Sequence, residues 1–260
     1  MQPLLDKAAF GLLEQGDLVY LDAAATSLVP KRVTRAVARY YDEVGGSPGR
    51  GVYRAAARAW RLIEDAREKV AGFINCDAEE VVFVKNATDG INLVAQGLPW
   101  SEGDVVVVTI YEHHSNLLPW LRARDRFGVV VKTVWPDANG DILAPLRETL
   151  ATAPKLVACM QTSNVLGTSL PIKEIAALAH AAGALLLVDG AQAAPHGLAD
   201  VAACDADFYV FSGHKALGPQ GAGVLVVRRR VWDLLQPGRV GGGIVNDLHG
   251  DFYSLTPPPT

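Results

Sequence analysis

The feature of this sequence that most constrains its fold is the regular alternation of helical and strand patterns along the chain. In the longer segments, apolar residues recur at the spacing of one helix face. Short apolar runs bounded by polar residues lie between these segments, and such runs are typical of strands buried on both faces. The alternation predicts an α/β fold with three layers, in which helices cover both faces of a mostly parallel, mixed sheet.

The predicted elements follow one another from residue 33 to residue 227. Helices are expected at Val33–Glu43, Arg54–Phe73, Asp89–Gln96, Asn116–Phe127, Ile142–Leu150 and Ile172–Ala182. Strands are expected at Val81–Val84, Val105–Thr109, Val129–Val134, Lys155–Met160, Ala184–Val188, Phe208–Phe211 and Val224–Val227. The last two strands have little helix between them, so an antiparallel pair is expected there. Ligand sites in such sheets lie beyond the carboxyl ends of the strands.

The composition excludes several other classes of protein. Half of the residues are hydrophobic, a fifth are charged and the net charge is −4, which excludes a disordered chain. No apolar run is long enough to span a membrane, and residues 1–20 contain no secretory leader pattern. The cysteines Cys76, Cys159 and Cys204 are too scattered for a disulfide framework or a zinc cluster. We therefore expect a cytoplasmic protein with no membrane partner.

Nucleic acid is not an expected partner either. The mildly acidic chain has one basic cluster, Arg228–Arg230, which lies directly before an apolar helix start. A solvated helix end is a better explanation of this cluster than a phosphate-binding patch.

Polar residues of several chemical kinds follow five of the predicted strands. These groups are Lys85–Gly90, Glu112–His114, Gln161–Asn164, Asp189–Gln192 and Ser212–Lys215. Because the carboxyl ends of parallel strands meet at one edge of a sheet, the five groups are expected to converge there.

Two of these residues suggest a pyridine cofactor with an aldehyde group. Lys215 directly follows a strand, where a lysine held out of bulk water loses its proton more easily and can form a Schiff base. Asp189 ends an apolar strand and needs a cationic partner such as a protonated pyridine nitrogen. Each residue alone also has an ordinary explanation, Lys215 as a surface lysine and Asp189 as a helix N-cap.

The remaining groups fit the other parts of such a cofactor. The small-residue turn Asn86–Gly90 leads into a helix and offers backbone N–H groups and the Thr88 hydroxyl to a phosphate, although it also fits an ordinary cap. Ser212 and His214 would add donors to the same phosphate. Taken together, the groups predict pyridoxal 5′-phosphate (PLP) as the cofactor.

The remaining candidates fit contacts with the pyridine ring of the cofactor and with the substrate. His113 would lie on the ring and transfer protons, and Gln192 and Asn164 would be amide donors. A metal site at His113–His114 is the weaker alternative, because nothing nearby completes a tetrahedral ligand set.

At this level of detail the sequence resembles the cysteine desulfurases and selenocysteine lyases of the sulfur-mobilisation type, within class V of the PLP-dependent transferases of fold type I. The resemblance extends over nearly the whole chain. It is carried by Tyr20–Asp22, Arg50–Gly51, Val82–Val84, Thr88–Ala95, Glu112–Asn116, Pro119–Trp120, Ser163–Gly167, Val188–Gln192, Asp207–Lys215 and Gly241–Gly243.

The resemblance implies a role for each candidate residue. It makes Lys215 the covalent attachment point, His113 the ring-stacking residue, Asp189 the partner of the pyridine nitrogen and Gln192 a donor to the phenolic oxygen. It places Ala87, Thr88, Ser212 and His214 at the phosphate, and Asn164 near the ring and the substrate carboxylate. In that family L-cysteine becomes L-alanine, and its sulfur passes to a catalytic cysteine thiolate as a persulfide.

The resemblance also implies a domain that this sequence lacks. Residues 1–20 are expected to form an N-terminal segment, 21–240 the PLP-binding large domain, and 241–260 a connection towards an absent small domain. In the family that domain supplies the nucleophilic cysteine and an arginine for the substrate carboxylate. None of the three cysteines matches that motif, and each is expected to be a packed thiol.

Several functional hypotheses follow. The first is a desulfurase part that needs a C-terminal half supplied by another polypeptide, with a homodimer expected from the resemblance. The alternatives are another class V PLP enzyme (aminotransferase, epimerase or lyase) or a catalytically silent PLP-binding remnant, because the cofactor does not fix which bond is broken.

Overall fold

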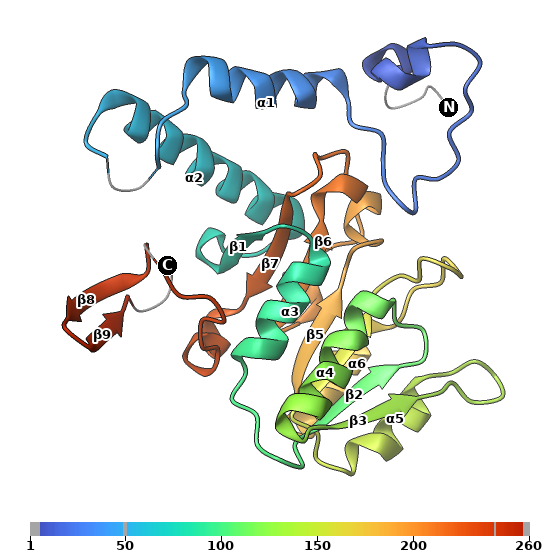
Figure 1. Ribbon diagram of the computed structural model, residues 1–260. Coiled ribbons are helices and arrows are strands. Elements are labelled where there is room, and N and C mark those ends of the chain that lie inside the picture. Colours follow the sequence, from blue (N-terminus) through green and yellow to red (C-terminus); the bar gives the residue numbers. More distant parts are fainter. Residues whose placement is uncertain (1–5, 49–50, 242, 257–260) are drawn as a thin grey trace.

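The computed structural model describes residues 6–48, 51–241 and 243–256. Its centre is a seven-stranded sheet in the order β1-β7-β6-β5-β4-β2-β3 (Figure 1). The strands are β1 (Val81–Val84), β2 (Val105–Thr109), β3 (Val130–Val134), β4 (Leu156–Met160), β5 (Leu185–Asp189), β6 (Phe208–Ser212) and β7 (Gly223–Val227). The predicted strands and their order of appearance are confirmed, with boundaries that differ by about one residue.

The sheet is parallel except at β7. This strand pairs antiparallel with β6 on one side and with β1 on the other, as expected for the pair without a helix between them. Because β7 runs against both neighbours, β1 has the same direction as the remaining strands. The carboxyl ends of β1, β2, β4, β5 and β6 therefore lie at one edge of the sheet, where the polar groups were predicted to converge.

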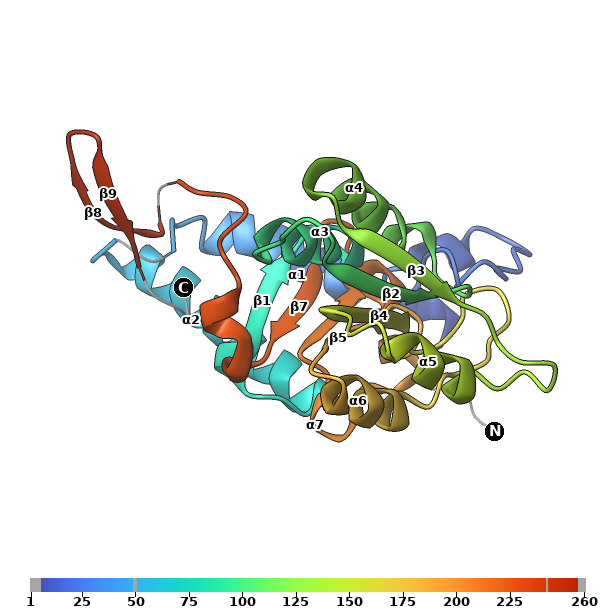
Figure 2. The same cartoon turned by 90° about the horizontal axis from the view of Figure 1, so that it is seen from below.

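Helices cover both faces of the sheet, which confirms the three-layer fold. The helices are α1 (Lys31–Glu43), α2 (Arg54–Ile74), α3 (Ala87–Gly97), α4 (Leu118–Phe127), α5 (Leu143–Leu150), α6 (Ile172–Ala181) and α7 (Val201–Cys204). One buried cluster joins α3 and α4 to the sheet, and the other joins the end of α2, α5, α6 and α7 to its opposite face. Figure 2 shows α3 and α4 on one side of the strands and α5 and α6 on the other.

The two cores take alternate residues of the same strands. In β5, Leu186 and Val188 belong to the core with α6, whereas Leu187 belongs to the core with α3. A strand that is apolar on both faces cannot show the apolar–polar alternation of a half-exposed strand. This is why the central strands are continuous apolar runs in the sequence.

Three predictions about elements need correction. The helix expected from Asn116 begins at Leu118, because a 3-10 turn at His114–Asn116 precedes it. The apolar segment after Arg228 forms a 3-10 helix, Arg229–Leu234. The stretch after Gly243, expected to be irregular, forms the separate hairpin β8 (Val245–His249) and β9 (Phe252–Leu255).

Some predicted features lie outside the central sheet or outside the described residues. Helix α1 has no buried residue and stands away from the sheet (Figure 1). Arg50 of the Arg50–Gly51 motif, Gly242 and Pro257–Pro259 fall outside the described residues. Within the described ranges, no helix combines the length and apolar character needed to cross a bilayer.

We predict that Gly223→Ala destabilises the fold. A β-carbon at this position of β7 would lie 2.6 Å from Asn86 Cα, and the nearest atoms are all backbone atoms. Because Asn86 caps α3 and cannot move aside cheaply, the free energy of unfolding should fall by about 1–3 kcal/mol in urea denaturation. Gly72→Ala in α2 is the matched control: it meets no atom within 4 Å and should gain up to about 1 kcal/mol from helix propensity. Equal effects of the two substitutions would contradict the crowding at Gly223.

Candidate active site

Asp189 is the buried acid at the predicted edge. It is the last residue of β5, and only 6% of it is exposed. One carboxylate oxygen accepts a hydrogen bond from Ala191 N at 2.9 Å. Burial raises the pKa of Asp189, while this hydrogen bond and electrostatic interaction with Lys215 and His113 act in the opposite direction. A cation placed against this carboxylate would stabilise its charged form.

Lys215 faces this acid from the next strand. It ends the 3-10 turn Gly213–Lys215, which directly follows β6, and it is partly buried. Burial lowers the pKa of the Lys215 amine, and Asp189 opposes that shift. The amine is therefore a better nucleophile near neutral pH than an exposed lysine would be.

His113 is held with its proton on a defined nitrogen. It caps the 3-10 turn after β2, where Ser115 N donates to His113 Nδ1 at 3.1 Å. Because Nδ1 accepts this bond, the neutral ring carries its proton on Nε2. Burial and the charge of Lys215 lower the pKa of His113, and Asp189 opposes them. The ring is thus an uncharged donor at neutral pH, with Nε2–H left for a ligand.

The start of α3 and the end of β6 form a cluster of small donors. Ala87 N donates to Ser212 Oγ at 2.9 Å, although 125 residues separate them. Thr88 Oγ1 donates to Ser115 Oγ at 2.7 Å, and Asn86 Oδ1 caps the helix by accepting from Asp89 N at 2.8 Å. The structure thus brings together Ala87, Thr88 and Ser212, three of the four residues predicted to hold a phosphate.

His214 and Gln192 are fixed by residues 24–27, which precede α1. Thr26 Oγ1 lies 3.1 Å from His214 Nδ1, and Ser27 Oγ donates to the His214 carbonyl at 2.8 Å. Gln192 Nε2 donates to Ala24 O at 2.8 Å. Sequence reasoning missed these contacts, because no local pattern marks Thr26 or Ser27 as neighbours of a turn nearly two hundred residues later.

Asn164 is a candidate for which the described residues provide no side-chain partner. It is exposed in the turn after β4, and among the described residues no hydrogen bond joins it to the rest of the site. Its neighbour Ser163 shapes this turn, since Ser163 Oγ accepts from Val165 N and Leu166 N. The predicted contact of Asn164 with a ring and a substrate stays a prediction.

The three cysteines are packed thiols. Burial raises the pKa of Cys76 to about 12 and also raises the pKa of Cys159 and Cys204. A thiol with a raised pKa holds almost no thiolate at neutral pH and is a poor nucleophile. This agrees with the prediction that none of them is a catalytic cysteine.

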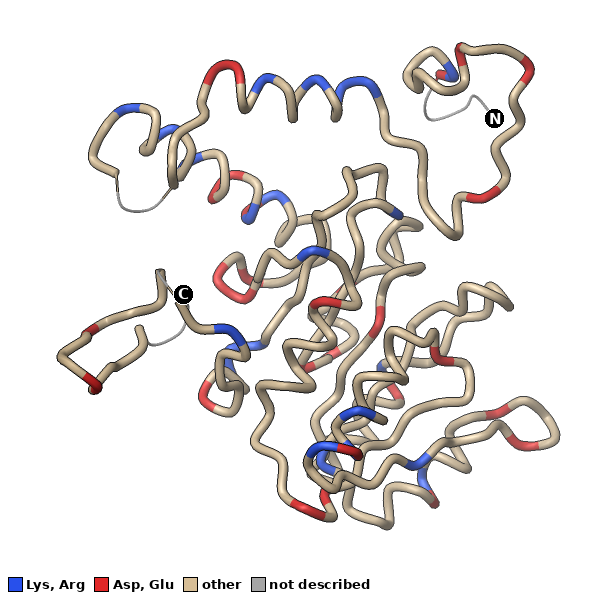
Figure 3. The backbone as a smooth tube through the Cα atoms, in the orientation of Figure 1, with Lys and Arg blue, Asp and Glu red and all other residues tan. Residues whose placement is uncertain are grey.

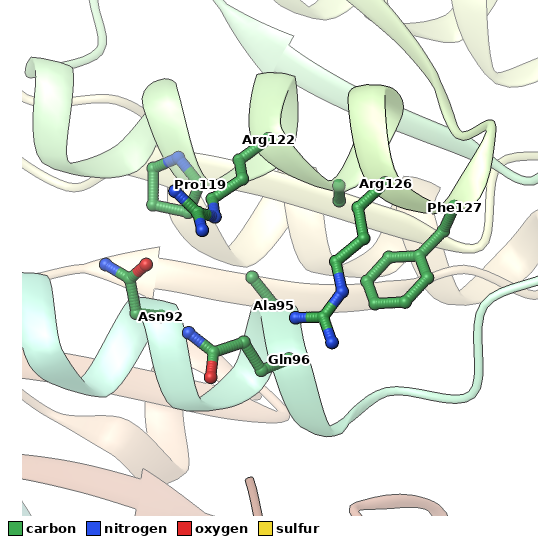
Figure 4. A pocket seen from close by; sticks show the side chains of 8 residues that line it. Asn92, Ala95, Gln96, Pro119, Arg122, Arg126 and Phe127 are labelled. Atoms are coloured by element: carbon green, nitrogen blue, oxygen red, sulfur yellow. The ribbon is translucent and has the colours of Figure 1, made fainter.

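Other charged features lie away from this edge. A groove between α3 and α4 is lined by Arg122 and Arg126 of α4 and by Asn92 and Gln96 of α3 (Figure 4). Figure 3 shows basic and acidic residues spread over the whole chain. Within the described ranges, no three potential metal ligands gather in one place.

The basic cluster of the sequence is engaged in ion pairs. Arg228 pairs with Glu80 at 3.3 Å, Arg229 with Glu79 at 2.6 Å, and Arg230 with Asp207 at 2.6 Å. These pairs attach the segment after β7 to the body of the domain. That the protein has no nucleic-acid partner stays a prediction.

Glu112 is a partly buried acid to which sequence reasoning assigned no role. It lies beside His113, and its carboxylate accepts hydrogen bonds from Thr109 Oγ1 at 2.5 Å, Asn116 Nδ2 at 2.6 Å and Met160 N at 3.0 Å. It thereby ties the turn that carries His113 to strand β4. Burial of the carboxyl group raises the pKa of Glu112 to about 8.

This pKa predicts how stability depends on pH. A carboxyl group whose pKa is higher in the folded state binds its proton more tightly there, so stability falls as pH rises from about 4.5 to about 8. Glu112→Gln should flatten this fall in the free energy of unfolding measured across that range. Exposed Glu148→Gln serves as the control for the loss of a carboxylate. An unchanged slope in Glu112→Gln would show that Glu112 titrates alike in the folded and unfolded chain.

Comparison with known proteins agrees with this geometry. A probable cysteine desulfurase of Methanothermobacter thermautotrophicus is 47% identical over 242 residues, covering 92% of this chain and 60% of that protein. The apo structure of a cysteine desulfurase from Thermococcus onnurineus matches with a TM-score of 0.91 at 39% identity, covering 97% of this chain and 64% of that one.

A third match is to a structure that contains a cofactor. It is a lysine-to-alanine mutant of C-DES with glycine covalently linked to its PLP cofactor, which matches with a TM-score of 0.84 at 26% identity, covering 97% of this chain and 66% of that one. The chain thus spans less than two thirds of each of these three proteins. The family model of class V aminotransferases matches residues 19–260, and the chain therefore belongs to the class V aminotransferase family.

Proposed function

We propose that this chain is the PLP-binding part of a cysteine desulfurase. The overall reaction would convert L-cysteine and an acceptor thiol into L-alanine and the acceptor persulfide, so the sulfur atom moves and no external oxidant is needed. The observation that carries this proposal is that buried Asp189, Lys215 and His113 lie at the carboxyl ends of parallel strands, at one edge of the sheet. The similarity to cysteine desulfurases over more than nine tenths of this chain supports it.

The residues present fit PLP. Buried Asp189 lacks a hydrogen-bonded cationic side chain among the described residues, and a protonated pyridine nitrogen would supply one. Lys215 Nζ would hold the aldehyde carbon, and the donors at the start of α3 with Ser212 and His214 would hold the phosphate. When bound, PLP supplies an electron sink for the carbanion chemistry of an amino acid.

The chain's own residues also provide for proton transfer. His113 would stack on the ring and hold a proton on Nε2, and Lys215, once free, would be the second group able to move a proton at the substrate α-carbon. Gln192 would donate to the phenolic oxygen, and Asn164 would approach the substrate carboxylate. The sulfur acceptor and the group that binds the substrate carboxylate would come from outside the described residues, since the pKa of each of the three cysteine thiols is raised.

The proposal extends to assembly and location. A homodimer, or assembly with a separate C-terminal polypeptide, would cover the exposed apolar side chains on and around α1 and α2. These include Tyr41, Val52, Tyr53 and Trp60. Three free cysteines are compatible with a reducing, cytoplasmic location.

We predict covalent attachment of PLP to Lys215. After incubation with PLP and reduction with borohydride, peptide mass spectrometry should find the adduct on Lys215. Lys215→Ala should abolish it, whereas Lys173→Ala on the exposed surface of α6 should not. An adduct on another lysine, or none in the wild-type protein, would remove the basis of the proposal.

We further predict L-cysteine turnover when the remaining part of the relatives' length is supplied. Alanine and persulfide sulfur should then form in equal amounts, and Lys215→Ala should lower the rate by at least about a thousandfold, as expected for loss of a covalent catalyst. Turnover of amino donors without alanine formation would favour an aminotransferase. Stable PLP binding with no turnover of any amino acid would indicate a silent PLP-binding remnant.

A further inference from the structure

One carboxylate lies at the helix end that would hold the phosphate, where the two negative charges would repel each other. Asp89 is the third residue of α3, in the first turn of the helix, and its side chain is only 11% exposed. Although burial acts to raise the pKa of Asp89, hydrogen bonds from Lys85 N and Arg239 outweigh it, so the pKa is lowered. Asp89 is therefore a fixed anion at neutral pH.

This anion has two opposite effects. A carboxylate in the first turn stabilises a helix because it faces the positive end of the helix dipole. The same charge repels any phosphate dianion bound at that helix end. An unpaired Asp89 would thus stabilise helix α3 but weaken the binding of a phosphate at its N-terminus.

Arg239 supplies the compensating charge. Its guanidinium Nη2 donates to Asp89 Oδ1 across a separation of 150 residues, while Asp89 Oδ2 accepts from Lys85 N at 3.1 Å. The carboxylate is therefore bound on both oxygens. Lys85 adds a second positive charge nearby.

A short segment along α3 delivers this arginine. We call residues 235–240 the return segment, since they run from the end of α3 back to its start. Gln236 N donates to Gly97 O at 2.8 Å at the helix end. Gly238 then lies against Gln96 and Leu93, and Arg239 reaches Asp89 at the first turn.

We infer that Arg239 is a positioning residue for the cofactor phosphate, which acts by neutralising Asp89 at the start of α3. This inference rests on the proposed PLP site. Arg239 itself is 59% exposed, so its contribution is electrostatic, modest and sensitive to salt.

The test compares dissociation constants of the apo-protein for PLP and for pyridoxal, which lacks the phosphate. Arg239→Gln should weaken PLP binding by about two- to fivefold, the range of charge effects at a helix N-terminus, and should leave pyridoxal binding unchanged. Asp89→Asn should tighten PLP binding, because the repelling charge is lost while Arg239 remains. The double variant should return to within about twofold of wild type, because both charges are then absent.

Arg229→Gln is the matched control. Arg229 is as exposed as Arg239 and pairs with Glu79 at 2.6 Å, so this variant should leave PLP binding unchanged. Raising the salt concentration should shrink the difference between wild type and Arg239→Gln.

The direction of the Asp89→Asn effect shows whether Arg239 acts on phosphate binding through its charge or only docks the return segment on α3. If Arg239→Gln, Asp89→Asn and the double variant weaken PLP binding alike, the ion pair between Arg239 and Asp89 serves only packing and the inference is overturned. An unchanged constant in Arg239→Gln overturns it as well. If wild-type protein binds no PLP, the proposed function fails and this inference fails with it.

Discussion

The buried carboxylate of Asp189 is the interaction on which the rest of the site depends. A buried charge without a partner is costly in free energy, so its surroundings must supply a positive charge or force it to take up a proton. Here burial raises the pKa of Asp189 and lowers the pKa of Lys215, and the two groups oppose each other's shifts. The site is thus left with an acid that a cationic ring would satisfy and with an amine ready to react.

Strand β7 determines which groups meet around this acid. Because it runs antiparallel between β1 and β6, the exits of β1 and β6 become neighbours. Ala87 and Ser212 can then bond directly, and the absence of a side chain at Gly223 allows the cap of α3 to approach the strand. The antiparallel strand of the main sheet therefore builds the cluster of donors that we assign to the phosphate.

Sequence patterns predict the features that depend on neighbouring residues. The strands, most helices and the polar ends of the strands follow from local periodicity, and so the common edge could be predicted with Asp189 and Lys215 on it. The contacts of Thr26, Glu112 and Arg239 could not, because each joins segments that only the folded chain brings together. The hairpin β8–β9 was missed because a glycine-rich sequence precedes it and its two short strands lie outside the main sheet.

The contact between Ser27 and the turn at His214 also bears on the biosynthesis of the protein. Ser27 is synthesised 187 residues before its partner at position 214. Until then, the early segment has nothing on which to dock, whereas β1 to β5 already lie close to one another in the chain. The first part of the domain to be synthesised is therefore among the last to reach its final contacts.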